Sequence, residues 1–162
     1  QIEFLNKWRN SDKYGDDIFA PSHYSFDYLF AISMAGQPLA WMEAANLPEE
    51  AYGLSSLVEA YKDISYDFHS GIPVGEEPSG TSWTGFQSLK GNGEGYFLLF
   101  RENNEDNIGK IETWLKEGEH IECTLVLGDG KTQDSLVKHN GVLEIELPKK
   151  NSFVMYKYKI RK

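Results

Sequence analysis

Cysteine is almost absent from this sequence of 162 residues, and long apolar runs are missing from it. Cys123 is the single cysteine, so no disulfide can form within the chain, and its place in the alternating pattern Ile121, Cys123, Leu125 indicates a small buried side chain. No stretch approaches the roughly 20 apolar residues of a membrane span, so no membrane partner is expected. These observations leave the location open between the cytoplasm and the periplasm or the exterior of the cell.

Basic residues are also scarce relative to acidic ones. The sequence holds 16 Lys and Arg against 25 Asp and Glu, a net charge of −9, and nucleic acid is therefore not an expected partner. Residues 1–80 carry 4 basic and 13 acidic side chains, whereas residues 81–162 carry 12 of each. This step in charge predicts two structural units.

Metal-ligand and nucleophile patterns are lacking as well. No two of the four histidines have the spacing of a metal site, and there is no cysteine cluster; the histidines are His23, His69, His120 and His139. The run Ser79–Ser82 has no lysine of a phosphate-binding loop, and no serine lies in a nucleophile elbow. We therefore predict neither a metal nor another cofactor.

The first half of the chain has helical patterns. Ile2, Leu5 and Trp8 are spaced as on one helix face, and Ser25 is a suitable N-cap for a helix over 26–35. Pro48 and two glutamates open a third helix, which continues with apolar residues at intervals of three and four to Phe68.

One short apolar segment, Leu39–Met42, interrupts these helices and does not alternate, which is typical of a parallel strand buried on both faces. Such a strand needs neighbours for its backbone groups, and the helical half supplies none. We therefore expect the neighbours to lie upstream, in a larger protein. Without them, we expect residues 37–45 to take another conformation, to be exposed or to pair with a second copy.

From Tyr96 onward the apolar period is two, with turn signals about every ten residues. Six strands are predicted, at 96–101, 108–115, 120–127, 135–138, 142–147 and 153–160. The dipeptides Asp129-Gly130 and Asn140-Gly141 favour tight turns. The predicted fold class is α+β, with an N-terminal helical segment at 1–71, an ordered connecting loop at 72–95 and a C-terminal antiparallel β-sandwich at 96–162.

Three short segments and the long helix after them resemble the last βα turn of a TIM-barrel glycosidase of the α-galactosidase type. The segments are Tyr28–Ala31, Pro38–Glu43 and Leu47–Glu50. Gly95–Arg101 resembles the first strand of the β-sandwich that closes those enzymes. The resemblance implies a C-terminal portion of a glycoside hydrolase, with the remnant of the barrel's end before the sandwich. The family's two catalytic aspartates lie on earlier barrel strands, and no residue of this chain matches their motifs, so we predict that the chain alone is inactive.

The resemblance gives two candidate binding residues at the rim of such a barrel. Trp41 would stack on a sugar and Glu43 would accept a hydrogen bond from a hydroxyl group, although packing by Trp41 and helix capping by Glu43 explain the same pattern. In the loop, Trp83 with Phe86 is a further candidate for a sugar platform, or else an anchor of the loop on the sandwich. Glu76 and Glu77 are adjacent and would point apart, so they make a poor acid/base pair.

Three functions remain open from the sequence. The first is a non-catalytic region that completes and supports an upstream catalytic barrel, with carbohydrate bound by the whole enzyme. The second is an independent carbohydrate-binding module that uses exposed aromatic residues such as Trp114, Tyr156 or Tyr158; Trp114 falls on the polar face of its predicted strand. The third is a structural domain that forms a homo-oligomer through its strand edges or helices.

Overall fold

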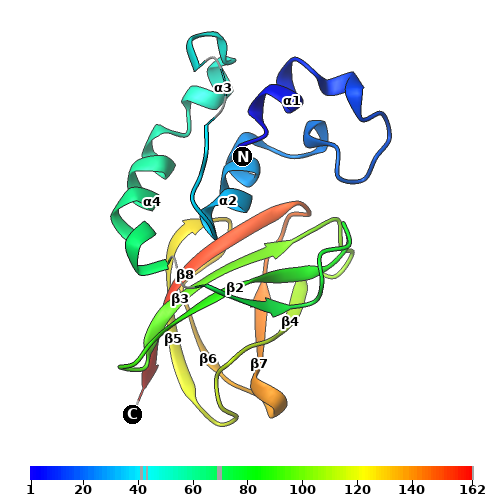
Figure 1. Ribbon diagram of the computed structural model, residues 1–162. Coiled ribbons are helices and arrows are strands. Elements are labelled where there is room, and N and C mark those ends of the chain that lie inside the picture. Colours follow the sequence, from blue (N-terminus) through cyan, green and yellow to red (C-terminus); the bar gives the residue numbers. More distant parts are fainter. Residues whose placement is uncertain (41, 43, 69–70, 162) are drawn as a thin grey trace. The chain divides into compact units, whose positions relative to one another are not determined.

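The computed structural model describes residues 1–40, 42, 44–68 and 71–161. These residues form two compact units, Gln1–Tyr66 and Asp67–Lys162. The first unit is helical and the second consists of antiparallel strands (Figure 1). The predicted α+β class, with helices before an antiparallel β-sandwich, is confirmed.

Short helices make up the first unit. The α-helices are α1 (Phe4–Trp8), α2 (Phe26–Met34), α3 (Glu49–Tyr52) and α4 (Ser55–Phe68), and the 3-10 turns are η1 (Ser11–Lys13), η2 (Pro21–His23) and η3 (Ala44–Asn46). Ser25 is the N-cap residue of α2, as predicted. The predicted third helix is divided in two, because Gly53 ends α3 before α4 begins.

Aromatic pairs provide the core of this unit. The rings of Phe4 and Phe26 meet edge to face with centroids 4.9 Å apart, and Phe30 meets Tyr61 in the same way at 5.7 Å. The Tyr61 hydroxyl donates a hydrogen bond to the Met34 carbonyl at 3.0 Å, which ties α4 to the end of α2. Burial raises the pKa of this hydroxyl above its ordinary value, so it remains a donor at neutral pH.

The described residues of the strand predicted at 39–42, which are Leu39, Ala40 and Met42, are not in a strand. Residues 37–40 have irregular backbone, and no strand occurs among the described residues before Ile72. The Leu39 carbonyl accepts one hydrogen bond, from the Ile2 backbone at 3.0 Å, and the Leu39 side chain is 54% exposed. The expectation that an apolar segment without neighbouring strands would leave the strand conformation and be exposed is confirmed for these residues.

The second unit is a two-layer sandwich. One sheet has the order β1-β2-β3-β8-β5-β6, and the other pairs β4 with β7; every pair is antiparallel (Figure 1). The strands are β1 (Ile72–Gly75), β2 (Trp83–Lys90), β3 (Glu94–Arg101), β4 (Ile108–Glu112), β5 (His120–Gly128), β6 (Gln133–Leu136), β7 (Val142–Glu146) and β8 (Ser152–Arg161). All six strands predicted after Tyr96 are present.

Alternate residues of both sheets form one apolar core between the layers. Cys123 is part of this core and is fully buried, as predicted, and burial raises the pKa of its thiol to about 12. The largest members of the core are aromatic or branched side chains: Trp83, Phe97, Ile111, Ile121, Leu143, Ile145, Tyr156 and Tyr158. The predicted alternation of β7 holds, since Leu143 and Ile145 are buried between glutamates.

The prediction of a connecting loop at 72–95 is wrong. This segment supplies β1 and β2, which extend the large sheet beyond β3. The inward positions of β2 include Gly85 and Gln87 rather than a run of apolar residues, so the usual alternating signal is missing. Gly85 lies against the backbone of β3, where an added Cβ would come within 2.2 Å of the Leu98 carbonyl oxygen.

Candidate functional site

Two of the three predicted substrate-binding residues, Trp41 and Glu43, lie outside the described residues. Their described neighbour Leu39 belongs to an irregular, exposed stretch. The predicted roles of Trp41 and Glu43 in sugar binding therefore stay predictions.

The third residue, Trp83, lies in the core of the sandwich and is 5% exposed. Its indole N–H donates to the Asp106 carbonyl at 3.2 Å, and its ring covers Gly109, where an added Cβ would come within 2.3 Å of ring carbons. A ring covered in this way cannot stack on a sugar. The structure corrects the predicted platform, and packing of the indole between β2 and β4 accounts for its position.

Two carboxylates near Trp83, those of Glu76 and Glu102, accept hydrogen bonds from the local backbone. The Trp83 N–H donates to the Glu76 carboxylate at 3.2 Å. At Glu77 the backbone carbonyl is the acceptor, and the Ser82 hydroxyl donates to it at 2.7 Å. The buried Glu102 carboxylate accepts hydrogen bonds from the backbone N–H groups of Ser79 at 3.1 Å and Ser82 at 2.7 Å. These contacts close the turn between β1 and β2, and they give the carboxylates of Glu76 and Glu102 a structural role.

Trp114 is the aromatic residue of the sandwich that faces solvent most clearly, with 62% of the residue exposed. It follows the end of β4, on the polar face that its sequence pattern predicted. Its backbone N–H donates to the Gln87 side-chain carbonyl at 2.8 Å, and its indole N–H donates to the Pro73 carbonyl at 3.3 Å. The indole is therefore fixed at its polar edge and open elsewhere.

The suggestion that Tyr156 and Tyr158 are exposed is wrong. Both belong to β8, which lies between β3 and β5, and their side chains alternate with exposed lysines and point into the core. They are 0% and 1% exposed, and burial raises the pKa of Tyr156 to about 12. Their hydroxyl groups have partners inside the fold, among them the Lys131 N–H and the Ser88 carbonyl.

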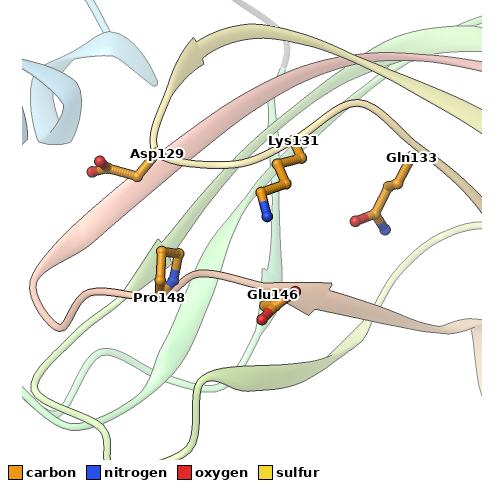
Figure 2. Close-up of a pocket in the computed structure, with 5 residues that line it drawn as sticks. All are labelled: Asp129, Lys131, Gln133, Glu146 and Pro148. Atoms are coloured by element: carbon orange, nitrogen blue, oxygen red, sulfur yellow. The ribbon is translucent and has the colours of Figure 1, made fainter.

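A small pocket on the sandwich lies at the end of β5 and β7 (Figure 2). It encloses about 60 Å³ and is lined by Asp129, Lys131, Gln133, Glu146 and Pro148. That volume is far below the several hundred Å³ of usual ligand pockets. Asp129 is paired with Lys149 at 3.0 Å, and the Gln133 amide donates to Ser135 at 2.7 Å, so polar groups at this pocket already have protein partners.

The first unit has two wider grooves that share Lys7, Phe26 and Glu50. Their volumes are about 440 Å³ and 320 Å³, and Trp8, Pro48 and Glu49 line the larger one. The Lys7 ammonium lies 5.2 Å from the centre of the Phe26 ring. Both grooves are shallow and open, which suits contact with another protein surface better than enclosure of a small substrate.

The described part of the chain was searched for metal sites and for membrane-spanning helices. No group of three or more His, Cys, Asp and Glu side chains there is arranged to hold a metal ion. No described helix has both the length and the apolar character needed to span a membrane.

Comparison with known proteins gives a likeness of fold. No protein-family profile matches the chain, and no curated protein matches it. Among solved structures, it is similar to an α-amylase from Anoxybacillus, reported as giving insight into a new glycosyl hydrolase subclass, with a TM-score of 0.50 and 10% sequence identity. The match covers 87% of this chain, which is more than the sandwich unit, and the chain spans 34% of that enzyme.

Proposed function

We propose that this chain is a non-catalytic C-terminal portion of a glycoside hydrolase, in which the helical unit completes an upstream catalytic barrel and the sandwich supports it. Carbohydrate is then the substrate of the whole enzyme, and the barrel supplies the pair of carboxylates that glycoside hydrolysis needs. The more specific proposal, that the parent is an enzyme of the α-galactosidase type, rests on the resembling sequence segments between Tyr28 and Arg101.

The observation that carries the proposal is the extent of the structural match. A likeness limited to the sandwich would fit any protein with an accessory β-domain, because β-sandwiches serve many unrelated functions. The match to the α-amylase instead includes part of the helical unit as well as the sandwich, and it uses 34% of that enzyme. A larger glycosidase with this combination of elements is therefore a suitable parent.

The surface of the helical unit supports the same proposal. Eight of the twelve large apolar residues exposed in the described part of the chain belong to this unit: Trp8, Tyr14, Ile18, Phe19, Ile32, Leu39, Tyr52 and Tyr66. Docking of another protein region would bury apolar side chains of this kind, so their number in the helical unit favours docking there. An upstream barrel would cover such side chains, and its last strands would provide hydrogen-bond partners for residues 37–42.

Reconstitution of the enzyme tests the proposal. The polypeptide encoded upstream of Gln1 is expressed with and without residues 1–162 as a separate chain, and hydrolysis of p-nitrophenyl α-galactoside, p-nitrophenyl α-glucoside and maltoheptaose is measured. We expect activity when both chains are present and none from residues 1–162 alone. Hydrolysis by residues 1–162 alone, or an upstream sequence without βα repeats, would overturn the proposal.

Two surface variants sharpen this test. Leu39→Lys replaces an exposed apolar residue of the helical unit, and Leu136→Lys makes the same change at a residue of similar exposure on β6, 54% and 50% respectively. We expect Leu39→Lys to prevent reconstitution, because a charge would be buried in the interface. Leu136→Lys should reconstitute like the unchanged chain, and equal effects of both variants would count against docking through the helical unit.

A further inference from the structure

The turn after β4 holds Trp114 in one orientation. Thr113 is fixed first, since its N–H and its hydroxyl both donate to the Gly141 carbonyl, at 3.1 and 2.6 Å. The Leu115 N–H donates back to the Thr113 hydroxyl at 3.2 Å, and the Leu115 side chain is buried. The residues on both sides of Trp114 are therefore anchored.

Trp114 itself is attached to the large sheet through the buried side chain of Gln87. The Gln87 carbonyl accepts from the Trp114 backbone at 2.8 Å, while its amide donates to the Tyr158 hydroxyl at 3.1 Å. That hydroxyl donates in turn to the Ser88 carbonyl at 3.0 Å. A fully buried glutamine is costly unless its polar atoms are paired, so this chain of bonds fixes the turn firmly to the core.

A purely structural role explains part of this arrangement. β1 is the edge strand of the large sheet, and the Trp114 indole N–H binds the Pro73 carbonyl of that edge. Covering an edge protects it from pairing with other chains. That role, however, uses only the N–H group at the polar edge of the indole. A smaller side chain with a hydrogen-bond donor could bind the same carbonyl, yet the residue here is a tryptophan that is 62% exposed.

We propose that the exposed indole of Trp114 is a binding platform for a carbohydrate chain, a site on the sandwich separate from any catalytic barrel. The choice of carbohydrate rests on the proposed function. A pyranose ring has a face of C–H groups that packs on the electron-rich face of an aromatic ring, and its hydroxyl groups lie around the rim. Glu112 and Lys116, two positions before and after Trp114, are also exposed and offer an acceptor and a donor for such hydroxyls.

Trp114 is 62% exposed, and it does not line any of the three pockets described above. Since an open platform contacts one face of a sugar, it binds a single monosaccharide weakly and gains from a polymer with many equivalent rings. The rigid turn lowers the entropy that must be lost on binding. A soluble polysaccharide is therefore the appropriate ligand class for a test.

Affinity electrophoresis of residues 1–162 in native gels that contain soluble starch or galactomannan tests the proposal. We expect at least one polysaccharide to retard the unchanged chain, and we expect Trp114→Ala to weaken the apparent affinity by about tenfold or more. Trp114→Phe, which keeps a flat ring, should retain part of the retardation. Leu136→Ala and Tyr66→Ala, which remove other exposed apolar residues, should migrate as the unchanged chain does.

A second measurement is made on the unchanged chain and uses a variant only to assign one signal. Four indole N–H signals are expected in the nuclear magnetic resonance spectrum of the unchanged chain, since it has four tryptophans. Addition of maltoheptaose or of galactomannan oligosaccharides should shift the Trp114 signal and leave that of the buried Trp83 in place. Trp114→Phe assigns the signal by its disappearance.

The outcomes separate this proposal from the proposed function. Absence of retardation by both polysaccharides, equal retardation of Trp114→Ala, or an unshifted Trp114 signal overturns the platform and leaves the reconstitution result untouched. Retardation that depends on Trp114 supports the platform even where reconstitution fails, and it then identifies the chain as an independent carbohydrate-binding module.

Discussion

The helical unit and the sandwich bury their apolar residues in different ways. In residues 1–66, aromatic pairs join short helices, and eight large apolar residues remain exposed. In residues 67–162, one continuous core joins two hydrogen-bonded sheets, and four large apolar residues are exposed in the described part. The sandwich joins its strands around one core, whereas the helical unit leaves twice as many large apolar residues exposed among the described residues.

Proteolysis of the whole chain should show this difference most strongly. We expect thermolysin, which cleaves beside exposed apolar residues, to cut first near Phe19 and Leu39, which are 53% and 54% exposed. A resistant product close to residues 67–162 should accumulate, because its backbone is held in sheets. Mass spectrometry identifies the product, and early loss of the sandwich with protected helices would reverse the comparison.

Matched core truncations should affect one unit each. Trp83→Ala empties the centre of the sandwich core and should lower its free energy of unfolding by about 3–5 kcal/mol. Phe30→Ala removes a partner of Tyr61 and should loosen the helical unit while the urea transition of the sandwich keeps its midpoint. The two transitions are followed by near-ultraviolet circular dichroism, and an equal loss in the sandwich from both changes would show that the units unfold together.

A methyl group added beneath Trp83 tests how tightly the sandwich is packed. Gly109→Ala places a Cβ within 2.3 Å of ring carbons, so we expect a loss of about 1–3 kcal/mol in the free energy of unfolding. Gly91→Ala is the control, since nothing lies within 4 Å of its added Cβ, and it should change stability by about 0.5 kcal/mol or less. Equal melting temperatures of the two variants would mean that the core can yield around the indole.

Alkaline pH should weaken the sandwich by a smaller amount. Burial raises the pKa of Cys123 from 9.0 to about 12, so the native state favours the neutral thiol. Its contribution to stability is complete below pH 9 and is lost as the pH rises from 9 toward 12, by about 1 kcal/mol between pH 9 and 10. Cys123→Ser should show a smaller loss over that interval in urea unfolding, and an identical pH profile would contradict the assignment.

The sequence predicted the strands that carry an apolar pattern between turn signals and missed those without one. Leu143 and Ile145 between glutamates are an unambiguous signal for β7, whereas β3 has a continuous apolar run whose residues 95–101 are all buried. β2 was missed because Gln87 and Gly85 occupy inward positions. Their burial depends on a partner hydroxyl from Tyr158 and on close approach of β3, and both are properties of the folded chain that no local pattern contains.

The candidate site residues also differ in how far a local sequence pattern predicts their exposure. Trp114 was placed correctly on a polar face by its own strand pattern, and its exposure follows from that pattern. Trp83 was left open between a sugar platform and an anchor on the sandwich, because it stands among glycines and serines that are typical of a loop. Its place in the core agrees with the anchor, and the pairing of β2 with β3 reveals it. Tyr158 was misjudged because tyrosines alternating with lysines leave open which face is inside.

The position of β8 has a consequence for how the protein is made. β8 follows the other strands in the chain but lies between β3 and β5 in the large sheet, with Phe97 opposite Tyr156 and Cys123 opposite Tyr158. During synthesis, β3 and β5 must wait with unpaired edges until residues 152–161 have left the ribosomal tunnel. Over this interval the nascent sandwich exposes two strand edges, and we expect a chain released from ribosomes stalled before Ser152 to be prone to aggregation.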